Sequence, residues 1–101
     1  MSALLRRARR VEVDRIEAIM IEELRLRSDS LTFAYEALAD GSRVSVQWSA
    51  HGRPVEATLR TTGEPRLILD SPARPVSPGQ SVVFYDVETG RHVLGAAQVG
   101  R

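Results

Sequence analysis

The chain has no cysteine and no lysine, and the missing cysteine narrows the chemistry open to it. Without thiols there is no disulfide, no thiolate metal ligand, no persulfide carrier and no cysteine nucleophile. All 14 positive residues are arginines, a bias that genome composition explains as easily as function does. Sulfur-relay and thiol redox chemistry are therefore excluded from this chain itself.

Long apolar runs are also missing. No run approaches the ~20 residues of a membrane-spanning helix, and the basic residues 1–10 lack the apolar segment of a signal peptide. We therefore expect a soluble, cytoplasmic protein that makes no contact with a membrane. With 101 residues and a formal net charge of +1, the chain has room for one domain with one modest core.

Residues 1–10 are the most basic part of the chain, because they hold Arg6, Arg7, Arg9 and Arg10. They show no sustained apolar period. This composition predicts a mobile basic arm over residues 1–10, followed by a single domain over residues 11–101.

Residues 14–27 fit two structures. Asp14 with Glu17 has the form of a capping box, and apolar residues recur on one helical stripe, which favours a helix from residue 15 to about residue 26. Leu24 and Leu26, however, alternate with charged residues as they would in a strand. The sequence pattern alone favours the helix.

From residue 40 onwards the pattern is that of β-structure. Residues 44–48, 55–59 and 66–70 have strand length, and turn signals at residues 40–42 and 62–65 separate them, with a rigid connector at residues 71–75. The side chains expected to point inward are those of Val44, Val46, Trp48, Val55, Ala57 and Leu59. Strands at this close spacing predict a small closed or nearly closed antiparallel barrel.

The C-terminal third reads as a corner followed by a hairpin. Pro78 fixes φ, and Gly79 can take a positive φ where the chain turns sharply. An apolar strand over residues 81–85 follows, which we expect to be buried on both faces or nearly so. Gly90 supplies the left-handed position of a polar tip at residues 86–91, and a second strand returns over residues 92–99.

This C-terminal third resembles the C-terminal signature of the tRNA-specific 2-thiouridylases, the enzymes that install sulfur at the wobble uridine of tRNA. The residues that carry the resemblance are assigned a structural role; they are Pro78, Gly79, Gln80, Phe84, Tyr85, Leu94 and Gly95. Residues 11–13, 23–29, 44–48 and 51–57 also fall in the order and spacing of that family's last portion.

The resemblance implies an all-β fold with minor α content. The barrel would be similar to the second domain of translation elongation factors, with a short N-terminal helix or turn. For residues 14–27 it implies one turn of helix near residues 16–21, followed by a strand over residues 23–27, and we lean towards that alternative.

The catalytic parts of the resembled family do not occur in this sequence. Its enzymes need an ATP pyrophosphatase loop and two catalytic cysteines, so we expect this chain to be non-catalytic, without a metal site or cofactor. His51 and His92 have no carboxylate or serine at a recognisable motif spacing, so we interpret them as surface histidines. Asp70, Asp86 and Glu88 sit in or beside turns, where carboxylates commonly bond local backbone N–H groups.

Arginines are the best binding candidates. Because the resemblance implies that this barrel helps to hold tRNA, we assign RNA-phosphate contacts to Arg6, Arg7, Arg9, Arg10, Arg53 and Arg74. Where the family tends to show an Arg-Tyr-Arg-like group, this chain has residues 48–51, Trp-Ser-Ala-His. Its ending keeps only Gly95 of a glycine-rich run, which suggests a looser demand for close backbone approach. Trp48 and Tyr85 are interpreted as core residues rather than stacking platforms.

The main hypothesis is therefore a non-catalytic tRNA-binding barrel that supports wobble-uridine 2-thiolation. The alternative is a protein-interaction or structural domain that docks on a separate catalytic thiouridylase domain or partner chain, through Leu4, Leu5, Ile19 and Met20. An exposed strand edge at residues 11–13 could also pair with a second chain. The sequence leaves the oligomeric state open.

Overall fold

The computed structural model describes residues 8–13, 16–48 and 53–100, with the backbone alone for residues 8–19. These residues form eight strands and one turn of 3-10 helix. In chain order they are β1 (Ala8–Val13), β2 (Ile16–Arg25), η1 (Ser28–Ser30), β3 (Thr32–Phe33), β4 (Ser42–Trp48), β5 (Val55–Arg60), β6 (Arg66–Ala73), β7 (Ser81–Tyr85) and β8 (Val93–Gln98).

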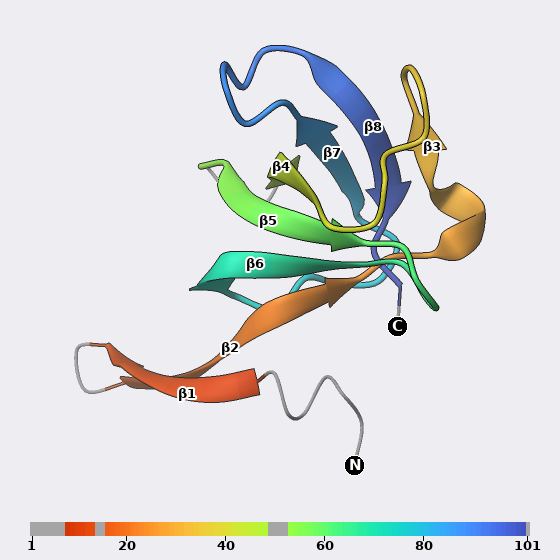
Figure 1. The fold of residues 1–101 in the computed structure, drawn as a ribbon. Coiled ribbons are helices and arrows are strands. Elements are labelled where there is room, and N and C mark those ends of the chain that lie inside the picture. The colour runs from red at the N-terminus through yellow and green to blue at the C-terminus, as the bar shows by residue number, and fades with distance from the viewer. Residues whose placement is uncertain (1–7, 14–15, 49–52, 101) are drawn as a thin grey trace.

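The strands form one antiparallel sheet in the order β1-β2-β6-β5-β4-β7-β8-β3. The sheet curls until Leu26, just after β2, forms a β-bridge with Val99, just after β8. Beside this bridge the Arg27 N–H donates to the carbonyl of Gln98 (2.8 Å) and the Gly100 N–H donates to that of Arg25 (2.9 Å). The strands from β2 to β8 therefore close into a ring (Figure 1), which confirms the predicted barrel.

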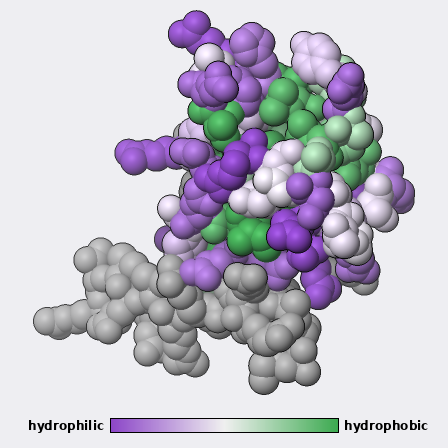
Figure 2. All heavy atoms as spheres, in the orientation of Figure 1, coloured by the Kyte–Doolittle hydropathy of each residue, from purple (hydrophilic) through white to green (hydrophobic). Residues whose placement is uncertain are grey.

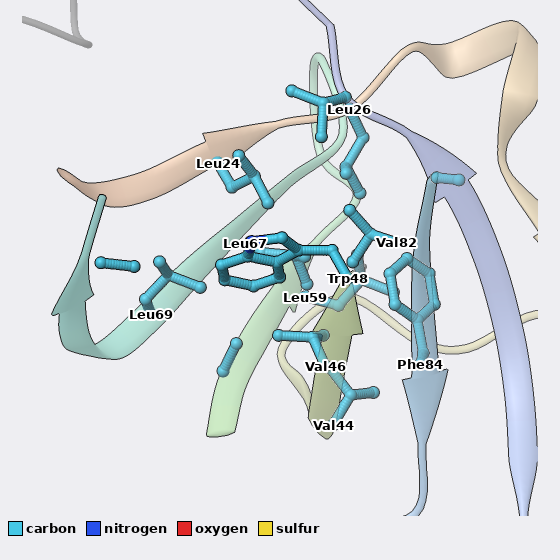
Figure 3. Packing of buried hydrophobic residues seen from close by; sticks show 14 of the residues in the cluster. Leu24, Leu26, Val44, Val46, Trp48, Leu59, Leu67, Leu69, Val82 and Phe84 are labelled. Carbon is cyan, nitrogen blue, oxygen red and sulfur yellow. The ribbon is translucent and has the colours of Figure 1, made fainter. Parts of the chain in front are cut away.

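The core lies inside this ring. The residues expected inward on β4 and β5 are buried there, except that Val55 is only partly buried. Figure 3 shows Trp48 and Phe84 meeting aliphatic side chains from the surrounding strands in the barrel interior. On β7, Val82 and Phe84 are fully buried and Val83 and Tyr85 are partly buried, which agrees with the expectation that this strand is buried on both faces or nearly so.

Residues 16–25 are a strand, so the helix predicted from residue 15 to about 26 and the helical turn predicted near residues 16–21 were both wrong. The strand expected from residue 23 is confirmed as the second half of β2. Leu24 lies opposite Leu67 of β6, and Leu24 and Leu26 are both buried. Residues two apart share a face only in a strand. Tertiary pairing with β1 and β6 thus overrides the helical stripe.

The predicted element boundaries shift at two places. β1 begins at Ala8, so the backbone of residues 8–10 belongs to a hairpin and not to the arm that was predicted over residues 1–10. Residues 1–7 lie outside the described part of the chain. Strand β6 continues to Ala73, so most of the predicted connector over residues 71–75 is strand.

Two signature glycines are required by the backbone. Gly79 takes the positive φ that was predicted (90°). Gly95 lies opposite both Phe33 of β3 and Phe84 of β7. A Cβ at Gly95 would collide with the carbonyl oxygen of Thr32 and lie 3.3 Å from a ring carbon of each phenylalanine. The sequence suggested that the backbones of neighbouring strands need not approach closely here. At Gly95 that expectation was wrong, because the β3 backbone leaves no room for a side chain.

We expect Gly95→Ala to lower the free energy of unfolding by about 1–3 kcal/mol, because the added methyl group forces β3 away from β8. Urea unfolding of the two proteins measures this difference as a lower midpoint for the variant. Ala37→Ser, at an exposed position in the loop after β3, is the control and should leave the midpoint unchanged. Equal midpoints for Gly95→Ala and the unchanged chain would contradict the close approach.

Candidate nucleic-acid interface

One end of the barrel brings together predicted RNA-binding residues from distant parts of the chain. Exposed Arg53 precedes β5 and exposed Arg74 follows β6. Because β5 and β6 are antiparallel, the start of one lies at the end of the other. The β1–β2 hairpin leaves the barrel at this same end, since Ile21 of β2 lies opposite Ala73 of β6. We call Arg53, Arg74 and this hairpin the hairpin end.

Of the other predicted RNA contacts, Arg9 and Arg10 belong to β1, where only the backbone is described. Arg9 lies opposite Met20 and Arg10 opposite Ile19. Arg6 and Arg7 lie outside the described residues, as does His51. The hairpin end is thus the only place where the described chain gathers several of these predicted contacts.

A second group of arginines was not among the predicted RNA contacts. Arg60 of β5 lies opposite Arg66 of β6, which in turn lies opposite Arg25 of β2. These residues form a row across three strands, which we call the arginine row. The signal that could have found it is the turn at residues 62–65, because Arg60 and Arg66 flank that turn and hairpin pairing sets them opposite each other.

Acidic neighbours neutralise much of the arginine row. Arg60 Nε lies 3.1 Å from Asp40 Oδ1, and Arg66 Nε lies 3.1 Å from Glu23 Oε1. Arg66 Nη1 also donates to the carbonyls of residues 62 and 64, at 3.1 Å each. The Glu23 side chain is only 5% exposed, so its ion pair with Arg66 is shielded from solvent. The row is therefore part of the barrel wall rather than an open phosphate-binding surface.

Asp70 does not bond a local backbone N–H, as its place beside a turn had suggested. Its carboxylate pairs with both terminal nitrogens of Arg43, one of them at 2.8 Å, and Arg43 also donates to the Thr58 hydroxyl (2.9 Å). Hydrogen bonding to the Arg43 guanidinium lowers the pKa of Asp70. Because Arg43 lies on β4 and Asp70 on β6, this ion pair braces two strands across β5.

Asp86 behaves as predicted for a turn carboxylate. It accepts hydrogen bonds from the backbone N–H groups of Thr89 (2.9 Å), Arg91 (3.1 Å) and His92 (2.8 Å), and from the Thr89 hydroxyl (2.8 Å). The His92 N–H and then the Thr89 N–H hold the pKa of Asp86 well below its usual range. These bonds order the turn between β7 and β8, and the side chains of Arg91 and His92 remain exposed on it.

The loop after β3 approaches this turn. The Ala34 N–H donates to the carbonyl of Leu94 (2.9 Å), which brings the next residue, Tyr35, to the start of β8. Tyr35 is 75% exposed and Val93 is 44% exposed. Phe33 packs against the core, whereas Tyr35 is not among the residues that do so. We call Tyr35, Arg91, His92 and Val93 the aromatic apex. Figure 2 shows apolar residues gathered over β7, β8 and β3 on the visible face.

Three small hollows lie on the barrel surface away from the apex. Two polar hollows, of about 300 and 400 Å³, are both lined by Arg27, whose guanidinium is bonded to the Asp29 carboxylate (2.9 and 3.2 Å) and to Gln98 (3.1 Å). A third, of about 80 Å³, is lined by Glu23, and Glu23 Oε2 has no hydrogen-bond partner among the described residues.

Residues 8–13, 16–48 and 53–100 contain no cluster of His, Asp and Glu side chains that could hold a metal ion. None of their helices has the length and apolar character of a membrane span.

The signature residues form the seam of the barrel. The Gly79 N–H donates to the carbonyl of Val99, and the Val99 N–H donates to that of Gln80, at 2.8 Å each. Phe84 is fully buried at the centre of the core.

The family model of the aminomethyltransferase β-barrel domain matches residues 19–99. The chain belongs to this family.

Members of the aminomethyltransferase β-barrel family that resemble the chain include tRNA-specific 2-thiouridylases. That of Hyphomonas neptunium is 36% identical over 101 residues, which is 93% of this chain and 25% of the relative. That of Kocuria rhizophila is 41% identical over 69 residues, covering 63% of the chain and 17% of the relative. The 2-thiouridylase of Shewanella sediminis is 43% identical over 51 residues, which cover 48% of this chain and 14% of the relative. No solved structure matches the chain.

These matches confirm the resemblance carried by the signature residues. The chain is a β-barrel domain of the kind found at the C-terminus of tRNA-specific 2-thiouridylases. It spans a quarter or less of the length of the relatives named above. In this family the barrel is an accessory, non-catalytic portion associated with tRNA modification.

We expect the Asp86 carboxylate to stabilise the fold in a pH-dependent way. Its pKa is depressed in the folded state, so its contribution is complete above the unfolded pKa of about 4 and is lost as pH falls below that value. Urea unfolding of the unchanged chain and of Asp86→Asn should therefore give a gap in stability at pH 6 that narrows at about pH 2.5. Asp40 and Asp70, whose pKa values are also lowered, are present in both proteins, so their pH-dependent contributions cancel in the difference between the two stabilities. A gap that is constant across this pH range would contradict the role of Asp86.

Proposed function

We propose that this barrel is an accessory tRNA-binding module that supports wobble-uridine 2-thiolation through contacts with RNA phosphates. The observation that carries the proposal is the hairpin end. There Arg53 and Arg74, both exposed, lie beside the hairpin whose first strand carries Arg9 and Arg10. Arginines that three segments bring to one end of the barrel match the spaced negative charges of an RNA backbone.

Phosphate contact, rather than base readout by the barrel wall, is supported by where the aromatics lie. Trp48, at the position where the family tends to carry its Arg-Tyr-Arg-like group, is 5% exposed and belongs to the core. Its ring is therefore not available to a base. Sequence-independent contacts made by arginines position RNA without reading it.

The thiolation chemistry itself would belong to the rest of a thiouridylase. The relatives are several times longer than this chain, and the chain has no cysteine to carry sulfur. In our proposal the barrel holds tRNA for a catalytic thiouridylase domain, whether that domain lies on the same polypeptide or on a partner chain.

The test is a fluorescence-anisotropy titration of the chain with a full-length tRNA and with a duplex RNA of equal length, at low and near-physiological salt. The unchanged chain should prefer tRNA and bind more weakly as salt rises. The double variant Arg53→Gln/Arg74→Gln should bind more weakly, and its salt slope should be smaller by about 1 for each phosphate that the variant no longer binds.

A matched control separates these contacts from the effect of net charge. Arg27→Gln/Arg60→Gln removes the same two charges from residues that are already paired with Asp29 and Asp40. This control should keep most of the affinity and the salt slope. Equal weakening in the two double variants, or no binding by the unchanged chain at low salt, would overturn the proposal.

The geometry of the hairpin favours docking on a catalytic domain as a second candidate function. Residues 16–20 of β2 pair with β1 alone, because pairing between β2 and β6 begins at Ile21. The hairpin therefore projects from the barrel (Figure 1), and an isolated two-stranded hairpin is marginally stable in water. The register assigns one of its faces to mostly apolar positions, at residues 11, 13, 16, 18 and 20, with Arg9 at the edge nearest the barrel.

This register changes the docking surface inferred from the sequence. Ile19 and Met20 are consecutive strand residues, so they belong to opposite faces of the hairpin, and only Met20 shares the apolar one. Leu4 and Leu5 lie outside the described residues. Under this candidate, Val11→Thr/Ala18→Thr weakens binding to a catalytic thiouridylase domain in a pull-down and leaves RNA affinity unchanged. A variant that keeps full binding to that domain would count against docking through this face.

A further inference from the structure

Tyr35 is the one aromatic residue that the barrel does not use. The chain has five aromatic residues. Trp48 and Phe84 are buried in the core, and Phe33 and Tyr85 are partly buried on the barrel wall. Tyr35, in contrast, is 75% exposed. A single exposed ring is common on protein surfaces, so the residues around Tyr35 decide whether it marks a binding site.

The surroundings of Tyr35 are apolar on one side. The hydrogen bond from Ala34 to Leu94 anchors the loop at the start of β8, where Val93 is 44% exposed. The register of β3 and β8, continued by this hydrogen bond, sets Tyr35 opposite Val93, so an exposed ring and an exposed aliphatic side chain occupy facing positions. Aromatic platforms of this kind bind bases with little regard to their identity, because every base has a π-face.

On the other side the turn before β8 carries one permanent cation, Arg91. Arg91 and His92 immediately precede Val93, and the Asp86 carboxylate holds their backbone N–H groups in place. Among the described residues Arg91 makes no ion pair, in contrast with Arg60 and Arg66 of the arginine row. The turn thus presents a cation from an ordered backbone, directly before the start of β8 where the loop with Tyr35 is anchored.

We infer that the aromatic apex is a stacking site for one unpaired RNA base. The Tyr35 ring stacks on the base beside Val93, and Arg91 contacts a phosphate next to that base. The inference rests on the proposed function, since it takes RNA as the ligand, and it adds a preference for unpaired nucleotides. A base inside a duplex is stacked on its neighbours and does not reach the ring.

The test compares a short stem-loop RNA that has an unpaired loop with a fully paired duplex of the same length. Tyr35→Ala should weaken binding of the stem-loop by about 5- to 100-fold, the range seen when one stacking ring is removed. Tyr35→Phe should keep the affinity, because the ring remains. Neither variant should change binding of the duplex. Thr62→Ala, exposed in the turn between β5 and β6, is the control and should bind both RNAs like the unchanged chain.

The outcomes separate this inference from the proposed function. If Tyr35→Ala binds the stem-loop as tightly as the unchanged chain, while the Arg53→Gln/Arg74→Gln variant loses affinity, the stacking site is wrong and the tRNA-binding module stands. If Tyr35→Phe loses as much affinity as Tyr35→Ala, stacking is wrong and the hydroxyl is the contact. If the unchanged chain binds neither RNA, the proposed function itself fails.

Discussion

The bridge between Leu26 and Val99 is the contact on which the rest of the molecule depends. It joins the end of β2 to the end of β8 and converts a curled sheet into a closed barrel. Both side chains are buried, and backbone hydrogen bonds flank them on both sides. Closure pairs the backbone edge of β8 that would otherwise be open and encloses the core on all sides. The signature residues Gly79 and Gln80 bond to the same Val99, so the segment that carries the family resemblance also closes the barrel.

Closure separates the wall of the barrel from its ends. On the wall, Arg43, Arg60 and Arg66 are paired with carboxylates and tie neighbouring strands together. At the ends, loops and turns carry exposed side chains at Arg53 and Arg74 on one side and at the aromatic apex on the other. Binding residues on loops that a rigid scaffold positions are a common arrangement in proteins. The wall supplies stability, and the ends supply the candidate contacts with RNA.

Much of the barrel could be predicted because its strands have a local pattern. The alternation at residues 44–48 and the turn chemistry of Gly79 and Gly90 follow from side-chain and backbone preferences alone, and both are confirmed. Residues 16–25 could not be assigned in this way. Their helical stripe and their strand alternation compete locally, and only pairing with distant β6 decides between them.

Parts of the candidate site were equally hidden from the sequence. The arginine row depends on the register of three strands, and the neutralisation of Arg66 depends on Glu23, which lies far away in the chain. The aromatic apex joins two loops through the single hydrogen bond between Ala34 and Leu94. Composition and spacing carry no information on contacts of this kind, because they arise only when the barrel closes.

The most direct measurement of the central claim, that the ends of this barrel hold tRNA, is a map of backbone amide NMR shifts during titration with a full-length tRNA. The account predicts that shifts concentrate at Arg53, Arg74, Tyr35 and Arg91, and that the turn at residues 62–65 stays unchanged. Shifts confined to the 62–65 turn and η1, or no shifts at low salt, would contradict it.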